Sequence, residues 1–171
     1  MKAFTLAFAI GAAAYHAVAR DGIFVASSIV DGLRQYIYDV DGTTKLATAS
    51  GAVQFLYNGG VVGNGVYGFL APGTFSGGYI SIPNMAGENA SITIEIWDKT
   101  TGSTYEQAMI SGHYMPTQTI RFTLGGGGGG VPSPPSELYG FTGGKLIVAP
   151  EPSKFALAVL GLGGLLFVSR R

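Results

Sequence analysis

The chain has 171 residues, zero net charge and no cysteine, so disulfide frameworks, cysteine-based metal sites and thiol catalysis are excluded. Between Arg20 and Ala149 it carries nine acidic and six basic residues, which argues against nucleic acid as a partner. This region of about 130 residues is long enough for one domain with its own core and too short for two.

The first 19 residues have the layout of a secretory signal peptide. A positive charge at Lys2 precedes the almost uniformly apolar stretch 3–15, and Ala17 and Ala19 form a small-x-small cleavage site. We therefore expect export, with cleavage between Ala19 and Arg20. The alternative is an N-terminal hydrophobic helix that is not removed.

Residues 20–149 predict an all-β domain. Runs of β-branched and aromatic residues alternate with turn signals such as Asp31-Gly32 and Asn58-Gly59, in a chain with 28 glycines. The expected fold is a sandwich or jelly-roll-like domain of about eight or nine short strands. We place these strands at 23–30, 34–40, 44–47, 52–57, 66–70, 79–82, 90–97, 118–124 and 145–148.

Two strands have the clearest pattern. Ile92, Ile94 and Ile96 alternate with polar residues and Trp97, as in a strand with one buried face. The run 118–124 alternates in the same way, with Ile120, Phe122 and Leu124 on one face and Thr119, Arg121 and Thr123 on the other. Between these strands, residues 104–110 predict a helix of about two turns, with Ser103 or Thr104 as its cap and Glu106 in its first turn.

Residues 125–136 are of low complexity. Six glycines are followed by a proline-rich run, so the first half is expected to be flexible and the second half extended. The segment predicts a mobile, exposed loop or tether inside the domain.

The same region offers no recognisable catalytic or metal site. His113 follows a glycine in a loop-like stretch, and no Gly-x-Ser-x-Gly elbow accompanies it, so a solvated or structural histidine is favoured. Asp39-Val40-Asp41-Gly42 lacks the Gly and Glu that an EF-hand loop requires at its sixth and twelfth positions, which favours a hairpin turn. We expect no enzyme activity, no metal and no cofactor.

An alternative function remains open for the domain. A carboxylate pair for glycoside hydrolysis is conceivable among nine acids, although no spacing singles out two of them. Aromatic side chains could stack on sugars, although a place in the core is favoured for most of them; these are Tyr36, Tyr38, Tyr57, Tyr67, Tyr79 and Trp97. The alternative is thus a carbohydrate-binding or weak glycosidase-like domain that acts on extracellular polysaccharide.

The segment 150–171 predicts a membrane anchor. After Pro150-Glu151-Pro152, residues 155–168 form a run of 14 without charge, about 21 Å long as a helix. This is shorter than most spans, but Lys154 and Arg170 have long side chains that can reach the interfaces. A buried core helix is the alternative. The apolar residues that we assign to the anchor are Phe155, Leu157, Leu160, Leu162, Leu165, Leu166, Phe167 and Val168.

Pro150-Glu151-Pro152, the apolar run and Arg170-Arg171 together resemble the PEP-CTERM sorting signal of Gram-negative bacteria. The resemblance covers about 22 residues, and family tails often end in a longer basic run. It implies a transient anchor in the inner membrane, with Arg170 and Arg171 on the cytoplasmic side, that an exosortase recognises and removes. The Sec export machinery would be the other transient partner.

The stretch Ile94–Glu106 with the strand and Gly/Pro-rich loop after it is also similar to a group of uncharacterised exported proteins of Verrucomicrobia-like bacteria that carry PEP-CTERM tails. This resemblance implies an extracellular β domain and no particular chemistry. Together, these observations predict a non-enzymatic exported protein. It would be anchored in the inner membrane before processing and then located at the cell surface or in the extracellular matrix.

Overall fold

The computed structural model describes residues 20–126 and 133–150. Among them, β-strands dominate and a single short helix is present, which confirms the all-β class. The strands are β1 (Gly22–Ser27), β2 (Ile29–Val30), β3 (Leu33–Arg34), β4 (Ile37–Tyr38), β5 (Gly51–Tyr57), β6 (Gly60–Ala71), β7 (Thr74–Ile82), β8 (Asn89–Asp98), β9 (His113–Thr123), β10 (Gly144–Lys145) and β11 (Ile147–Val148), and the helix is α1 (Tyr105–Ser111).

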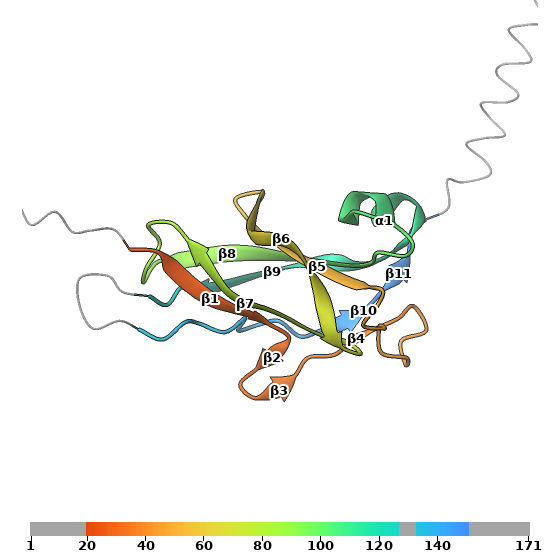
Figure 1. The fold of residues 1–171 in the computed structure, drawn as a ribbon, viewed down its shortest axis with the longest axis horizontal. Helices are drawn as coiled ribbons and strands as arrows, with labels where there is room; N and C mark the ends of the chain where they lie inside the picture. Colours follow the sequence, from red (N-terminus) through yellow and green to blue (C-terminus); the bar gives the residue numbers. More distant parts are fainter. Residues whose placement is uncertain (1–19, 127–132, 151–171) are drawn as a thin grey trace, which may run out of the picture.

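One curled antiparallel sheet of seven strands forms the body of the molecule, in the order β1-β7-β6-β5-β8-β9-β11 (Figure 1). Two small sheets, β2-β3 and β10-β4, lie beside it. The free edge of β1 is covered by chain that follows β9. Ile23 exchanges backbone hydrogen bonds with Gly125 at 2.9 and 3.0 Å, and Val25 donates to the carbonyl of Ser136 (2.7 Å).

Phenylalanine rings fill the inside of the curl. Phe24, Phe55 and Phe75 pack edge to face with centroids 5.8–5.9 Å apart, and Phe122 and Phe141 extend the cluster. These rings come from four strands of the sheet and from the segment before β10. The core therefore joins regions that are far apart in the chain, and no disulfide is needed to hold them.

The prediction of short strands is wrong for the middle of the sheet, where β6, β7, β8 and β9 have 12, 9, 10 and 11 residues. Gly63-Asn64-Gly65 falls between the predicted strands 52–57 and 66–70, but it lies inside β6 as an irregularity in the pairing of that strand with β5. Gly63 and Gly65 have φ of 77° and 90°, which only glycine adopts readily, so the strand passes through a bulge. The Tyr67 hydroxyl accepts the Asn64 N–H there (2.7 Å).

The predicted turns are confirmed. Asp31-Gly32 and Asn58-Gly59 have positive φ at both residues, the geometry of tight hairpins between β2 and β3 and between β5 and β6. The first strand is shorter than the predicted range 23–30. β1 ends at Ser27, and Ile29 and Val30 form the separate strand β2.

The low-complexity segment is partly built into the fold. Gly125 is buried, and a Cβ on it would lie 2.0 Å from the carbonyl oxygen of Pro134. Gly126 and Ser133 also exchange backbone hydrogen bonds, at 3.1 and 3.2 Å. The expectation of a tether is therefore wrong at both ends of this segment, because the missing side chain of Gly125 permits close backbone packing, although Ser133 and Pro134 are exposed as expected. Residues 127–132 lie outside the described residues.

Candidate functional site

The C-terminal junction, where the chain leaves the domain, is the main candidate site. β11 is an edge strand that pairs with His113 and Tyr114 at the start of β9. The next residue, Ala149, is buried, and its N–H donates to the carbonyl of Gly112 (2.8 Å). Pro150 is then exposed. Proline has no N–H to continue the ladder, so ordered pairing with β9 ends where the predicted sorting motif begins.

Helix α1 lies directly beside this junction, between β8 and β9. Thr104 is its N-cap, with its side chain accepting from Gln107 N–H, and Glu106 is in its first turn, as predicted. Its C-cap is Gly112, the residue that holds Ala149. A Cβ on Gly112 would lie 2.6 Å from the Thr101 hydroxyl, so the close approach of these segments requires glycine.

The helix buries a second, smaller core on the outer face of the sheet. Trp97 and Tyr105 are fully buried and pack edge to face, and Tyr114 packs against Tyr105. The Tyr105 hydroxyl donates to the carbonyl of Met115 (2.8 Å), and burial raises its pKa to about 12. Trp97 Nε1 has no acceptor among the described residues. Trp97 therefore belongs to the core, as predicted, and has no exposed ring face on which a sugar could stack.

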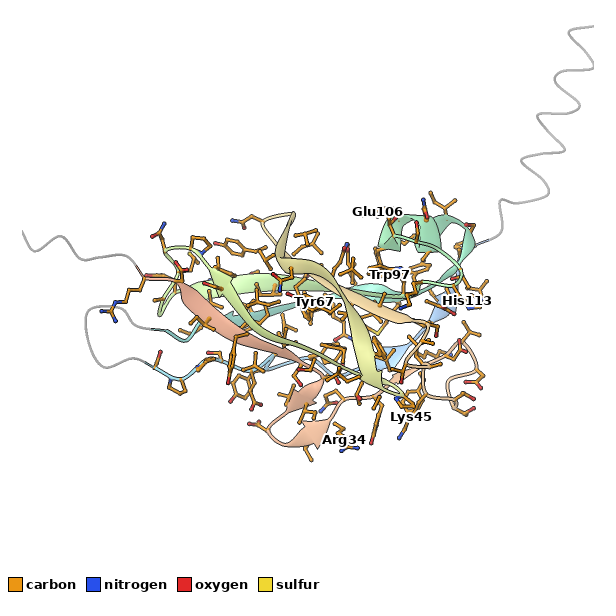
Figure 2. The ribbon with its side chains drawn as sticks, viewed as in Figure 1. Arg34, Lys45, Tyr67, Trp97, Glu106 and His113 are labelled. Atoms are coloured by element: carbon orange, nitrogen blue, oxygen red, sulfur yellow. The ribbon has the colours of Figure 1, made fainter. Side chains whose placement is uncertain are left out.

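His113 is not in a loop, because it is the first residue of β9. Its N–H donates to the Thr101 hydroxyl (2.8 Å), and its Nδ1 lies 4.0 Å from Asp98 Oδ2, too far for a hydrogen bond. The side chain is about one-third exposed. Figure 2 places His113 near Trp97 at the α1 end, where it helps to pin the start of β9. The favoured structural role agrees with this arrangement.

Glu95 on β8 is a buried acidic group with a shifted pKa. Its carboxylate accepts from the Gln54 amide on β5 at 2.5 Å. Burial raises the pKa of Glu95, and the charge of Glu106 on α1 adds to this effect while Gln54 opposes it. The spacing of Glu95 and Glu106 in the sequence does not predict that their charges interact, because the interaction depends on the way α1 folds back over β8.

The remaining aromatic candidates are spread over the molecule. Tyr36 has the Lys45 ammonium 3.6 Å from its ring centroid, so this cation already covers one ring face. Arg34 and Lys45 lower the pKa of the Tyr36 hydroxyl, and both lie on the lower side in Figure 2. Tyr38 lies beside Tyr36, with centroids 6.4 Å apart.

Three tyrosines complete the set. Tyr57 and Tyr67 are half-buried against the main core, whereas Tyr79 is 74% exposed. The expectation that most of these aromatic residues fill the core is thus correct for Trp97 and only partly correct for the tyrosines.

The predicted turn at Asp39–Gly42 is confirmed. Gly42 N–H donates to the carbonyl of Asp39 (2.9 Å), and Asp41 accepts from the N–H groups of Thr43 and Thr44 and from the Thr44 hydroxyl. The Thr44 hydroxyl is the main reason that the pKa of Asp41 falls to about 2. Within residues 20–126 and 133–150, no three His, Asp or Glu side chains form a group able to hold a metal ion.

The N-terminal junction lies at the opposite end of the long axis from α1 and β11 (Figure 1). Arg20 is exposed, its carbonyl accepts from Ala86 N–H (3.0 Å), and β1 begins two residues later. Asp21 anchors this start by accepting a hydrogen bond from the Ser81 hydroxyl (2.8 Å).

Most of the predicted processing residues lie outside the described residues. These are Ala17 and Ala19 of the signal, Glu151 and Pro152 of the sorting motif, the apolar run 155–168, and Arg170 and Arg171. Among the residues that the structure does describe, no helix has both the length and the apolar character to cross a membrane.

Searches of protein-family models, curated proteins and solved structures found no match to this chain.

Proposed function

We propose that this chain is an exported, non-enzymatic protein of the cell surface or extracellular matrix that a PEP-CTERM/exosortase system sorts. Two cleavages process it, one after Ala19 and one near Pro150-Glu151-Pro152. Before the second cleavage, the apolar run 155–168 holds the chain in the inner membrane, with Arg170 and Arg171 on the cytoplasmic side.

The observation that carries the proposal is the position of the two cleavage points relative to the folded domain. Arg20 is exposed just before β1, and Pro150 is exposed just after Ala149, whose N–H makes the last hydrogen bond to Gly112. The described core is built from residues 24–149. Cleavage at either junction would therefore release the domain without removing a core residue.

The polar outer face of β8 and β9 supports a role without catalysis. Thr93 and Thr119 pair there through their hydroxyls (2.9 Å), and Thr123 donates to Asn89 (2.8 Å). Such a face of hydroxyl and amide groups suits a hydrated surface or contacts with matrix.

The test is the intact mass of the protein from a bacterium that has an exosortase and from the same strain lacking it. The expected product in the first strain starts at Arg20 and ends near Pro150–Pro152. In the second strain, the tail should persist and the protein should sediment with membranes. A product ending at Arg171 in both strains, or a tailed form that stays fully soluble, would end the sorting proposal.

One observation favours the alternative, a carbohydrate-binding or weak glycosidase-like domain. Glu95 has a raised pKa, as a general acid needs, and the charge of Glu106 contributes to that shift. Binding of Glu95→Gln and parent protein to a panel of purified bacterial polysaccharides would test it. Affinity for one polysaccharide that the variant loses, while its melting temperature is no lower than that of the parent, would support this function.

A further inference from the structure

The small β10-β4 sheet carries lysine and tyrosine side chains on its outer face. Tyr38 on β4 lies between two lysines, because it forms an antiparallel bridge with Lys45 and pairs in parallel register with Lys145 on β10. Residues that pair directly in neighbouring strands present their side chains to the same face of a sheet. Tyr36, two residues before Tyr38, lies on that face as well. We call Tyr36, Tyr38, Lys45 and Lys145 the lysine–tyrosine face.

Burial agrees with this orientation. Ile37, Leu46 and Leu146 alternate with the residues of the lysine–tyrosine face, and all three are fully buried in the main core. By contrast, the two lysines are exposed and the two tyrosines are half-buried. The lysine–tyrosine face therefore points away from the core and into solvent.

The lysine side chains on this face are held in place. Lys45 Nζ lies 3.6 Å from the centroid of the Tyr36 ring, and the rings of Tyr36 and Tyr38 have centroids 6.4 Å apart. The stem of Lys145 lies against the turn after β4, since a Cβ on Gly42 would be 3.4 Å from its Cδ. Side chains that are positioned before a ligand arrives lose less entropy when it binds.

Arg34 adds a third positive charge at one end of the face. It lies next to the Tyr36 hydroxyl, whose pKa it lowers, and Figure 2 shows Arg34 and Lys45 on the lower side of the molecule, away from Glu106 on α1. Half of the six basic residues of an otherwise acidic domain thus gather in this region.

The carboxylates of the described chain do not neutralise these charges. None of them forms an ion pair with Arg34, Lys45 or Lys145. The acids of the turn after β4, Asp39 and Asp41, accept hydrogen bonds from N–H and hydroxyl groups of the turn itself. The lysine–tyrosine face therefore combines unpaired positive charge with aromatic rings.

We propose that the lysine–tyrosine face binds an anionic polysaccharide, with one sugar ring stacked on Tyr38 and the charged groups of neighbouring sugars on Lys45 and Lys145. Tyrosine suits this contact, because its ring packs against the C–H face of a sugar while its hydroxyl stays in water. The backbones of the two lysines are two strand spacings apart, roughly 10 Å, which is comparable to the length of a disaccharide. An ammonium group is a point charge with three donors, so it binds carboxylate and sulfate groups alike.

The inference gives the proposed role at the cell surface or in the matrix a partner, and it does not depend on the sorting tail. A nucleic acid fits the same face less well. Lys45 covers one face of the Tyr36 ring, and the two tyrosine rings are tilted by 59°, so they offer no parallel platform for successive bases. A lipid phase fits less well too, because the aliphatic residues that alternate with the face are buried in the core.

The test measures binding of the full chain, in a neutral detergent, to three immobilised polymers: polygalacturonate with its carboxylates, dextran sulfate with its sulfate esters, and uncharged dextran. Lys45→Gln/Lys145→Gln removes two charges from the face. The matched control is Lys99→Gln/Arg121→Gln, which removes two charges from exposed positions elsewhere. Tyr38→Leu removes the aromatic ring, and Tyr38→Phe keeps it. Thermal melts verify that the variants keep the parent fold.

The expected result is binding to at least one charged polymer, no binding to dextran, and affinity that falls as the salt concentration rises. The charged polymer that binds identifies carboxylate or sulfate as the recognised group. Lys45→Gln/Lys145→Gln should lose at least about tenfold in affinity, and the control pair less than about twofold. Tyr38→Leu should lose about fivefold or more, whereas Tyr38→Phe should bind like the parent.

Equal losses in the two double variants would indicate unspecific attraction and would overturn the proposal. The absence of binding to either charged polymer would overturn it too, as would full affinity in Tyr38→Leu. Stronger competition by single-stranded DNA or by short-chain phosphatidylglycerol than by the soluble polymer would assign the face to that other partner.

Two further results separate this inference from the proposed function. Glu95→Gln should bind the polymer like the parent, and a loss of affinity in that variant would place the polysaccharide at Glu95 instead of on the lysine–tyrosine face. A negative outcome of the sorting test would leave this binding site standing, because no contact in it involves the tail.

Discussion

The buried Glu95 lowers the stability of the folded state at neutral pH. Replacing its carboxyl group with an amide should remove this loss. Because burial raises its pKa, the native state keeps a proton that the unfolded state has already lost when the pH exceeds the ordinary carboxyl value. The contribution of this group to stability therefore falls as the pH rises through that window. Glu95→Gln keeps a partner for Gln54 without the charge.

We expect the melting temperature of Glu95→Gln, relative to that of the parent, to rise by a few degrees between about pH 4 and about pH 7. Glu88→Gln, at an exposed position, is the control for the lost charge and should not reproduce the trend. Parallel melting curves for Glu95→Gln and the parent would show that Glu95 is not desolvated in the native state.

Asp41 shows the opposite shift, with a different cause. The Thr44 hydroxyl and the N–H groups of Thr43 and Thr44 stabilise its charged form and hold its pKa at about 2. The stabilisation is present above the ordinary carboxyl pKa and is lost as the pH falls toward 2. Thr44→Val should raise the Asp41 pKa, as measured by carbon-13 NMR titration of the carboxyl group. An unchanged pKa would contradict the assignment of the Thr44 hydroxyl as the main cause.

At the scale of the element, β8 tests the alternating pattern. Ile94 is fully buried in the main core, whereas Thr93 is half-buried on the other face and bonds to Thr119. Ile94→Asp buries an unpaired charge and should cost more than about 4 kcal/mol, enough to unfold the domain. Thr93→Asp should cost about 1 kcal/mol. Urea unfolding followed by circular dichroism gives both values, and equal losses would contradict the register of β8.

The alternating pattern of β8 predicted the buried residues of its inner face, but it did not predict that half of its outer face is buried too. Ile92, Ile94 and Ile96 are buried as the pattern indicated, but Glu95 and Trp97 are buried too. The reason is tertiary, since α1 folds back over one end of the strand, and no period within the strand encodes a cover from elsewhere in the chain.

The glycines are the second place where the predicted and the observed structures differ. Gly63 and Gly65 precede the predicted strand 66–70, yet they form a bulge inside β6. Gly125 packs tightly against Pro134, in the segment that predicts a tether. A sequence reveals that glycine permits a turn, a bulge or a close approach, but the neighbouring strand decides which of them occurs.

The α1–β9 connection should be sensitive to one added methyl group. Gly112→Ala would place a Cβ 2.6 Å from the Thr101 hydroxyl and 3.0 Å from the Ala108 Cα, so either α1 or the Thr101 turn must shift. We expect a loss of about 1–3 kcal/mol in the free energy of unfolding. Gly68→Ala in β6 is the control, since its Cβ would meet no atom within 4 Å. Similar denaturant midpoints for the two variants would show that the junction tolerates the shift.

At the scale of the whole molecule, the last residues of the domain limit where the proposed processing enzyme could cut. Leu146 is fully buried in the main core, and Ala149 is 5% exposed, whereas Pro150 is exposed. A product that ends at Ala149 keeps every described core residue and should melt within about 2 °C of the chain with its tail. A product that ends at Lys145 loses Leu146 and the pairing of β11, at a cost of several kcal/mol.

The three forms can be compared by differential scanning calorimetry, with Leu146→Ala in the tailed chain as the control for the lost side chain. That variant should lose about 2–5 kcal/mol on its own. The product ending at Lys145 should lose more, because β11 and the hydrogen bond from Ala149 to Gly112 go as well. If the form ending at Lys145 melted like the tailed chain, the domain would not need its last strand, and the position of the proposed sorting motif directly after Ala149 would have no structural reason.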